Sequence, residues 1–373
     1  MNLALSDEQE LLREAARNAL ARVKTVEAAR AALEEGDEHR DLPDLWPTAI
    51  EAGWSGLVVS EEHGGAGLGA FEAMLVAQEC GRVLAGVPLL GHVVATYVLD
   101  AAGYDRLEAL AAGDRRAAIV VARPPDDRED GWTVEPHQGM RRAPAPSVDG
   151  DGGLSGGAWW VPDAPGADVL VVVGVRDGDP VAVVVERPEV EAVSRYDATR
   201  SLGHVALDGV SGTVLEPGEA VLRNAWYLAQ ALLAAEAVGT VETCLEMAVA
   251  YAKERFTFGR AIGSYQAVKH ELVEILRRLE NARSLMYYAG WAAADEPEEL
   301  PVAASAFRLV ASEAFDHAAR TLISVHGGIG ATWEHDAPLY FRRAQLSRRL
   351  LGGAGLAADR VADELFAQAV AAG

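Results

Sequence analysis

Helical periodicity in the C-terminal part of the chain constrains the fold more than any other feature. Apolar residues recur at three- and four-residue spacings in two long segments: Val238, Val241, Leu245, Ala248 and Ala252, then Val268, Leu272, Ile275, Leu279 and Ala282. This spacing predicts long helices that each bury one apolar stripe. Further helices are expected around 307–325 and over 357–370. The sequence from residue 218 onward therefore predicts a domain of packed helices.

The rest of the chain divides by composition into a helical part and a part made of short strands. Residues 1–113 are rich in Ala, Leu and Glu, and Ser6 with Gln9 forms a capping-box pattern ahead of a first helix. Residues 114–217 contain short apolar runs separated by Gly, Pro and Asp, which predict strands. The clearest runs are 117–122, 169–175 and 181–185, with a hairpin turn over 176–180. We therefore predict an α+β protein of three domains: helical over 1–113, β over 114–217 and helical over 218–373.

Charge and cysteine content exclude several classes of partner and site. The 33 basic and 56 acidic residues give a net charge of −23, which repels nucleic acid backbones and anionic lipids. Only Cys80 and Cys244 are present, so we expect no disulfide framework, and no metal site is predicted. The N-terminal residues become charged within seven positions, and no apolar run approaches the roughly 20 residues that span a bilayer. We expect a cytoplasmic protein without a signal peptide or membrane helix.

Two glycine-containing corners between helices are candidates for an anion site. The segment 251–270 ends one long helix and begins the next, with Arg255 and Gln266 flanking the glycines. A cation and an amide at such a corner suit a pyrophosphate, although an Arg255 that merely caps carbonyls would give the same pattern. In 324–330, Ser-Val-His-Gly-Gly-Ile-Gly, consecutive glycine N–H groups can approach an anion closely, or the glycines can simply end a helix.

These corners, a glycine loop at 64–69 and the helix–β–helix order together resemble the acyl-CoA dehydrogenase family across nearly the whole chain. Three stretches are similar to family motifs: 57–68 to a loop ending in Gly-Gly-x-Gly-Leu, 251–266 to Arg-x-x-Phe-Gly followed by Gln, and 326–340 to Gly-Gly-x-Gly. A fourth motif, Arg-Asp-Ala, is matched by Arg342 and Ala344, with Arg343 in place of the aspartate.

The resemblance implies a fold and a chemistry. The fold has an N-terminal helical domain, a middle β-barrel-like domain and a C-terminal four-helix bundle, usually assembled as a tetramer built from dimers. The cofactor is FAD and the substrate an acyl-CoA thioester. A carboxylate removes the α-proton, the β-carbon passes a hydride to the flavin, and an electron-transfer flavoprotein or similar acceptor reoxidises the flavin.

By this resemblance, the family's own catalytic and flavin-ring elements are missing here. The catalytic glutamate aligns with Leu351, and an alternative position on the preceding long helix aligns with Ala229, so neither side chain can take a proton. Three glutamates on that helix are alternative bases, although such residues are usually solvated: Glu236, Glu242 and Glu246. In the β-domain, 121–127 keep almost none of the flavin-ring stretch, and Pro162 replaces the threonine of a second motif. Trp160 in that motif therefore fits core packing better than flavin contact.

The elements with which a neighbouring subunit clamps the ADP half of FAD are, by the same resemblance, kept. They predict cofactor-binding residues Arg255, Phe258, Gly259, Gln266, Ser324, Gly327 and Gly328, where Ser324 stands for the usual glutamine. No catalytic residue is predicted. The pattern resembles the non-catalytic subunit of the heterotetrameric acyl-CoA dehydrogenases of bacterial steroid side-chain degradation.

The leading hypothesis is therefore a subunit of a two-chain, FAD-dependent acyl-CoA dehydrogenase that contributes the ADP-clamping half of the FAD site to a catalytic partner subunit. By resemblance, the substrate is a steroid-derived or otherwise bulky CoA ester. One alternative is a homomeric dehydrogenase whose base has moved, for example to Glu236. Another is a scaffold or acyl-CoA binding protein without a redox role, and oxidases or hydroxylases of the same fold form a further class.

Overall fold

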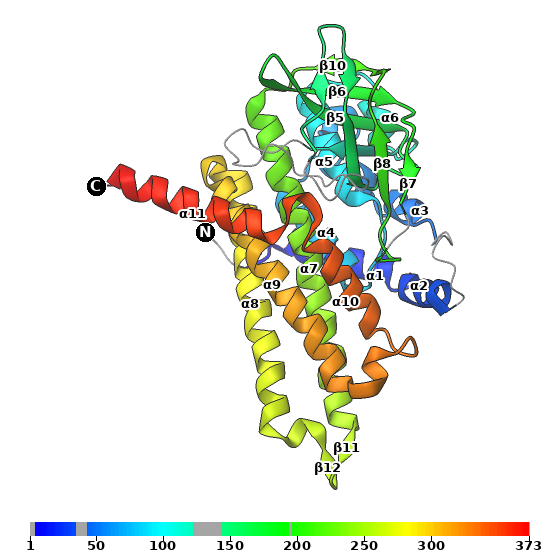
Figure 1. Cartoon of the computed structure of the whole chain (residues 1–373), viewed down its shortest axis with the longest axis vertical. Coiled ribbons are helices and arrows are strands. Elements are labelled where there is room, and N and C mark those ends of the chain that lie inside the picture. Colours follow the sequence, from blue (N-terminus) through cyan, green and yellow to red (C-terminus); the bar gives the residue numbers. More distant parts are fainter. Residues whose placement is uncertain (1–3, 35–42, 122–142, 194–195, 373) are drawn as a thin grey trace.

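The long helix α7 (Glu219–Glu254) is the element around which the rest of the molecule is arranged. The structure is a computed structural model that describes residues 4–34, 43–121, 143–193 and 196–372. α7 packs against helices of both the N-terminal and the C-terminal parts, as Figure 1 shows. Its 36 residues span about 54 Å at 1.5 Å per residue, so its two ends lie far apart.

The N-terminal part is helical, as predicted. Its described helices are α1 (Asp7–Leu20), α2 (Thr25–Glu34), α3 (Trp46–Glu51), α4 (Ala70–Arg82), α5 (Leu89–Ala101) and α6 (Leu107–Ala111). The capping box is confirmed, because Gln9 N donates to Ser6 Oγ over 3.2 Å and Ser6 N to Gln9 Oε1 over 3.0 Å. α4 crosses α7 in backbone contact: a Cβ on Gly239 would lie 1.8 Å from the Gln78 carbonyl oxygen. Only glycine allows that approach, which joins the N-terminal helices to α7.

The middle part consists of two open sheets. The larger has the strand order β10-β6-β5-β2-β3-β9, with β1 paired in parallel to β5, and the smaller has the order β4-β8-β7. Among the described residues these sheets do not close, so the expected barrel-like form is corrected to an open one. The strands are β1 (Ala117–Val120), β2 (Ser147–Val148), β3 (Gly153–Ser155), β4 (Gly157–Pro162), β5 (Val169–Arg176), β6 (Asp179–Glu186), β7 (Glu191–Ala192), β8 (Leu202–Ala206), β9 (Val210–Ser211) and β10 (Thr213–Leu215).

The predicted hairpin is confirmed as β5 and β6. The strands pair antiparallel from Val169 opposite Glu186 to Arg176 opposite Asp179. The two-residue turn Asp177-Gly178 has positive φ at both positions, +54° and +99°. An Asp-Gly turn of this kind matches the twist of the flanking strands.

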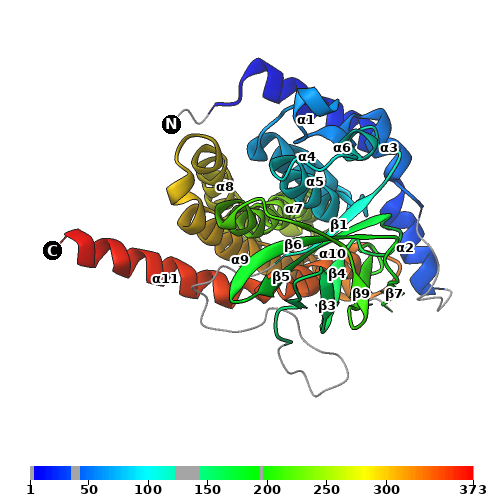
Figure 2. The same cartoon turned by 90° about the horizontal axis from the view of Figure 1, so that it is seen from above.

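The C-terminal part is helical as predicted. Its helices are α7, α8 (Gln266–Asp295), α9 (Leu300–His326), α10 (Ala337–Ser347) and α11 (Gly353–Ala372). α7, α8 and α9 pack together, α10 and the start of α11 contact α9, and the end of α11 projects away from the body (Figure 2). Within the described ranges, none of the helices combines the length and the apolar composition that crossing a bilayer requires. The domain boundaries at 113 and 217 stay a prediction.

Candidate functional site

The residues predicted to bind a cofactor gather at one end of the helical domain. α7 ends at Glu254 and is followed by a small hairpin, β11 (Phe256–Thr257) and β12 (Arg260–Ala261), before α8 begins at Gln266. α9 ends at the same end of the molecule, as Figure 1 shows. Tyr251 and His326 stack there with ring centroids 4.2 Å apart. We call the seven residues at this end, 255, 258, 259, 266, 324, 327 and 328, the clamp surface.

The hairpin presents Arg255 and Phe258 to solvent. Phe258 and Gly259 have φ of +52° and +77°, the pair of positive angles typical of a two-residue hairpin turn. The Phe258 side chain is 93% exposed. Within the part of the chain that the structure describes, the exposed Arg255 guanidinium makes no hydrogen bond or ion pair, so capping of carbonyls does not explain this arginine.

Gly327 and Gly328 leave an open backbone surface beside the hairpin. Gly327 has φ +65° and ends α9. A Cβ added to either glycine would meet no atom within 4 Å, and the side chains of Ser324 and Gln266 are exposed. Nothing in the chain itself therefore requires glycine at Gly328. Open glycine backbone and an exposed guanidinium at the same end of the molecule suit the phosphates of a dinucleotide, although the Gly327 N–H itself donates to the Ile323 and Ser324 carbonyl oxygens.

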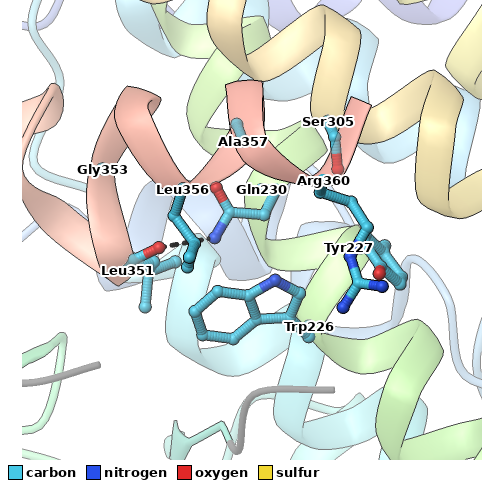
Figure 3. A pocket seen from close by; sticks show the side chains of 9 residues that line it. All are labelled: Trp226, Tyr227, Gln230, Ser305, Leu351, Gly353, Leu356, Ala357 and Arg360. Atoms are coloured by element: carbon cyan, nitrogen blue, oxygen red, sulfur yellow. Dashed lines mark hydrogen bonds between the residues drawn. The ribbon is translucent and has the colours of Figure 1, made fainter. Parts of the chain in front are cut away.

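The position aligned with the family's glutamate lies near the start of α9, far from the clamp surface at the end of this helix, and is filled by packed side chains. Leu351 sits between α10 and α11 with φ +52° and is 4% exposed. Figure 3 shows it with Trp226, Tyr227 and Leu356 around a cavity of ≈ 10 Å³. Gln230 Nε2 donates to the Leu351 carbonyl oxygen over 2.8 Å. Such a cavity holds about one water molecule, so no thioester fits there.

A buried arginine fixes this region. Arg308 on α9 is 0% exposed and donates to Gln230 Oε1 over 3.0 Å and to the Leu350 carbonyl oxygen over 3.3 Å. It also donates to Ser312 Oγ. Burial lowers the pKa of Arg308 to about 10, so the side chain stays charged at neutral pH. Arg308 was not predicted from the sequence, although its apolar neighbours at helical spacing gave a signal: Ala304, Ala311 and Phe315.

Charged residues also form ion pairs between the β-domain and the helical bundle. Arg343 on α10 donates through Nε to Asp197 Oδ2 over 2.6 Å and through Nη2 to the Thr199 carbonyl oxygen over 2.8 Å. Arg343 Nη1 and Glu236 Oε2 are 3.5 Å apart, and Arg200 pairs with the same carboxylate. We call Asp197, Arg200, Glu236 and Arg343 the ion network.

The alternative bases are all paired. Glu236 belongs to the ion network, and the cavity next to it measures ≈ 10 Å³. Glu242 pairs with Arg82 over 2.8 Å and with Arg283 over 3.0 Å. Glu246 pairs with Arg82 over 2.9 Å. These pairings could not be predicted from the sequence, because each partner lies on another helix or loop.

Trp160 and its neighbours pack against the core. The Trp160 ring meets His204 edge to face with centroids 4.9 Å apart, and Pro162 pairs with Leu202 at the end of β4. The stretch expected to be altered at 121–127 lies, except for Val121, outside the described residues. The described residues hold no group of three or more His, Cys, Asp or Glu side chains arranged for a metal ion.

Comparison with known proteins matches the N-terminal and the C-terminal helical parts to one family. Residues 6–109 match the family described as acyl-CoA dehydrogenase, N-terminal domain, and residues 218–366 match acyl-CoA dehydrogenase, C-terminal domain. The acyl-CoA dehydrogenase IpdE2 of Mycobacterium tuberculosis is 33% identical over 349 residues, covering 92% of this chain and 93% of that protein.

Two solved structures are similar over nearly every residue. A variant of the Tcur3481-Tcur3483 steroid ACAD superposes with a TM-score of 0.83 at 29% identity, covering 98% of this chain and 99% of that one. The ChsE4-ChsE5 complex from Mycobacterium tuberculosis superposes with a TM-score of 0.82 at 25% identity and the same coverage.

Proposed function

The chain belongs to the acyl-CoA dehydrogenase family, and from this premise we propose that it is the non-catalytic subunit of a two-chain, FAD-dependent enzyme. When bound, FAD accepts the hydride as an acyl-CoA thioester is oxidised between its α and β carbons. This chain holds the ADP half of FAD on the clamp surface. The partner chain supplies the pocket for the flavin ring and the carboxylate that removes the α-proton.

The observation that carries the proposal is a contrast between two regions. The clamp surface is open: within the described ranges the Arg255 guanidinium makes no hydrogen bond or ion pair, and a Cβ added to Gly327 or Gly328 would meet no atom within 4 Å. In a chain of net charge −23, an exposed cation that makes no hydrogen bond or ion pair with the described residues favours a local phosphate site. The region around Leu351 is instead closed, with a cavity of ≈ 10 Å³.

The ion network argues against the alternative of a homomeric dehydrogenase whose base has moved to Glu236. A relocated base at Glu236 needs a carboxylate that faces a substrate, and this one pairs with two buried guanidinium groups beside a cavity of ≈ 10 Å³. A base must lie within hydrogen-bond reach of the proton that it removes. Glu236 therefore acts as a structural ion-pair partner.

The similar structures support a second chain and a substrate class. Two of them are named for pairs of chains, Tcur3481-Tcur3483 and ChsE4-ChsE5, and the first is named a steroid ACAD. We accordingly propose a steroid-derived CoA ester as the substrate of the complex. An electron-transfer flavoprotein or a similar acceptor reoxidises the flavin.

Flavin stoichiometry tests the proposal directly. The chain is expressed alone and together with the dehydrogenase-like protein of a neighbouring gene, and FAD is measured by absorbance against polypeptide concentration. We expect no FAD and no activity from the chain alone, and one FAD per pair of unlike chains in the active complex. A yellow, active protein obtained from this chain alone would contradict the proposal.

A glycine substitution distinguishes the clamp surface from a redox-inert scaffold. Gly328→Ala adds a methyl group that meets nothing within 4 Å in this chain, and the same holds for the control Gly150→Ala in the β-domain. We expect both variants to keep the free energy of unfolding, and only Gly328→Ala to lower the FAD content of the complex. Arg255→Ala should lower it at least tenfold. A scaffold predicts unchanged FAD in all three variants.

A further inference from the structure

A column of three stacked rings lies next to the clamp surface. The ring of His326, the last residue of α9, stacks on Tyr251 of α7 with centroids 4.2 Å apart, and its other neighbour is the His335 ring with centroids 4.1 Å apart. His326 is 5% exposed and directly precedes Gly327. Tyr251 accepts a hydrogen bond from the Arg255 backbone N–H over 2.9 Å through its carbonyl oxygen. The column therefore connects the two glycine corners that carry the clamp surface.

The hydrogen bond of His335 requires a neutral ring. The backbone N–H of Ala337, the first residue of α10, donates to His335 Nδ1 over 3.1 Å. A proton on Nδ1 would remove this acceptor, and a positive charge is unfavourable at the N-terminus of a helix. Burial, together with the neighbouring His326 ring, lowers the pKa of His335. His335 thus acts as a neutral cap of α10.

The hydrogen bond of His326 is compatible with a protonated ring. Because a carbonyl oxygen only accepts, the bond of 2.8 Å to the Leu322 carbonyl oxygen places a proton on His326 Nδ1, and the protonated ring keeps this bond. The Nε2 atom makes no hydrogen bond with any residue that the structure describes. His326 also ends α9, and the helix dipole favours a positive charge at a C-terminus. Of the two histidines, His326 is therefore the one that can carry a second proton.

The other titratable groups beside the column leave both histidines without a carboxylate partner. These groups are Arg30 of α2, Asp336, Tyr340 of α10 and residues 253–255 at the end of α7. Asp336 pairs with Arg30, and burial raises the pKa of Tyr340, so this hydroxyl stays neutral. Within the described ranges, no carboxylate forms an ion pair with His326 or His335. An anion that binds at the clamp surface is thus the group that can compensate a charge on His326.

We propose that His326 takes up a proton from solvent when the phosphates of FAD bind to the clamp surface, whereas His335 stays neutral. The Cα atoms of His326 and Gly327 are about 3.8 Å apart, so phosphates at Gly327 lie within the roughly 10 Å over which charges act at 0.1 M salt. A stacked phenyl ring could not supply this charge. The inference rests on the proposed function and adds regulation by pH. Because the bound state carries more protons, the affinity for FAD rises as the pH falls.

Titration of the flavin-free two-chain complex with FAD, followed by flavin fluorescence at pH 8.5 and at pH 6, tests the inference. The pyrophosphate of FAD does not titrate in this range, so a change reports on the protein. We expect the Kd to be at least threefold lower at pH 6. Calorimetry at pH 7 in two buffers of different ionisation enthalpy should show proton uptake on binding. An equal Kd at both pH values, or no proton uptake, overturns the inference alone. Absence of FAD binding at both pH values contradicts the proposed function, and the inference falls with it.

Three asparagine variants locate the proton. His326→Asn can donate to the Leu322 carbonyl oxygen through its amide but cannot titrate, so it should abolish the pH dependence and the proton uptake. His335→Asn can accept the Ala337 N–H through its amide oxygen and should keep both. His270→Asn should also keep both, because His270 is exposed on α8 and its charge is screened by solvent. Thermal unfolding verifies that each variant folds. Proton uptake that persists in folded His326→Asn, or that is lost in either of the other variants, overturns the inference.

Discussion

Arg343 and Asp197 form a buried ion pair, with 2.6 Å between Nε and Oδ2 and side chains that are 3% and 1% exposed. Arg343 lies on α10, and Asp197 lies in the loop before β8, so the pair joins the helical bundle to the β-domain. By the resemblance, Arg343 stands where the family has an aspartate. Because this position carries a positive charge in place of a negative one, α10 of the helical bundle can form an ion pair with Asp197 of the β-domain.

Removing one member of this pair should be costly. Asp197→Asn leaves the Arg343 guanidinium buried without the negative charge that it pairs with at this position. We therefore expect the free energy of unfolding to fall by about 3–5 kcal/mol. The double variant Arg343→Met with Asp197→Asn should lose less than the sum of the two single variants. Urea unfolding of the three variants measures this coupling.

An exposed ion pair serves as the control. Arg13 Nη2 and Glu10 Oε2 lie 2.8 Å apart on α1, with side chains 32% and 48% exposed. Glu10→Gln should change the free energy of unfolding by less than about 1 kcal/mol. If Asp197→Asn costs no more than Glu10→Gln, the ion network does not hold the two parts together.

His92 should make the chain sensitive to acid. Its ring is fully buried between the Ser55 carbonyl oxygen at 2.9 Å and the Ala117 N–H at 3.0 Å. Burial lowers the pKa of His92 to about 4 from an ordinary 6.5, so the folded state binds fewer protons. The stability that His92 contributes is present above pH 6.5 and is lost as the pH falls through 4. That loss amounts to about 3 kcal/mol.

The variant His92→Gln isolates this effect, because glutamine does not titrate. Urea unfolding at pH 7 and at pH 4.5 should give a steeper loss of free energy for the natural chain than for the variant. The variant is expected to be less stable at pH 7, since it loses a packed ring. Parallel loss of stability in the two proteins would show that His92 is not a source of acid sensitivity.

The helix–β–helix order could be predicted because it rests on local signals. Apolar spacing in 238–252 and 268–282 reports contacts along single helices, and the hairpin of β5 and β6 needs only two adjacent runs and the Asp-Gly turn at Asp177. That the two glycine corners lie at the same end of the molecule is a matter of tertiary structure, which local sequence signals do not report. It depends on the stacking of Tyr251 on His326, and no spacing in the sequence encodes that contact.

The ion network could not be predicted because its members are distant in sequence. Arg343 lies 146 residues from Asp197, and Glu236 lies 36 residues from Arg200. Glutamates on a long helix are usually solvated, so sequence alone left Glu236 as a candidate base. The packing around Leu351 could not be predicted either. A leucine in place of the glutamate does not show whether a substrate-sized cavity remains next to it.

Phe258 offers a test of whether the hairpin is shaped for stability or for a ligand. Its φ of +52° is unfavourable for phenylalanine, and its side chain is 93% exposed. Phe258→Asn provides the residue that this turn prefers and should raise the free energy of unfolding by about 0.5–1 kcal/mol. On the proposed function, the same variant should lower the FAD content of the two-chain complex. Loss of stability together with unchanged FAD would assign Phe258 a purely structural role.

Leu351→Glu tests whether the chain lacks only a base. The side chain at this position is 4% exposed beside a cavity of ≈ 10 Å³, so a new carboxylate is buried with room for about one water molecule. Since one water molecule at most solvates that carboxylate, we expect the free energy of unfolding to fall by about 2–4 kcal/mol, and the isolated variant to bind no FAD and to oxidise no acyl-CoA. Because the backbone φ is +52° for either side chain, strain does not enter the difference.

The control for this variant is Leu365→Glu on α11. Leu365 is 55% exposed, so the same substitution should change the free energy of unfolding by less than about 0.5 kcal/mol. The comparison separates the cost of burying a carboxylate from that of replacing a leucine. Dehydrogenase activity of isolated Leu351→Glu would mean that the flavin site is intact apart from the base. In that case the packed side chains around Leu351 and the ion network do not exclude the flavin ring, and the chain is a self-contained enzyme that has lost one residue.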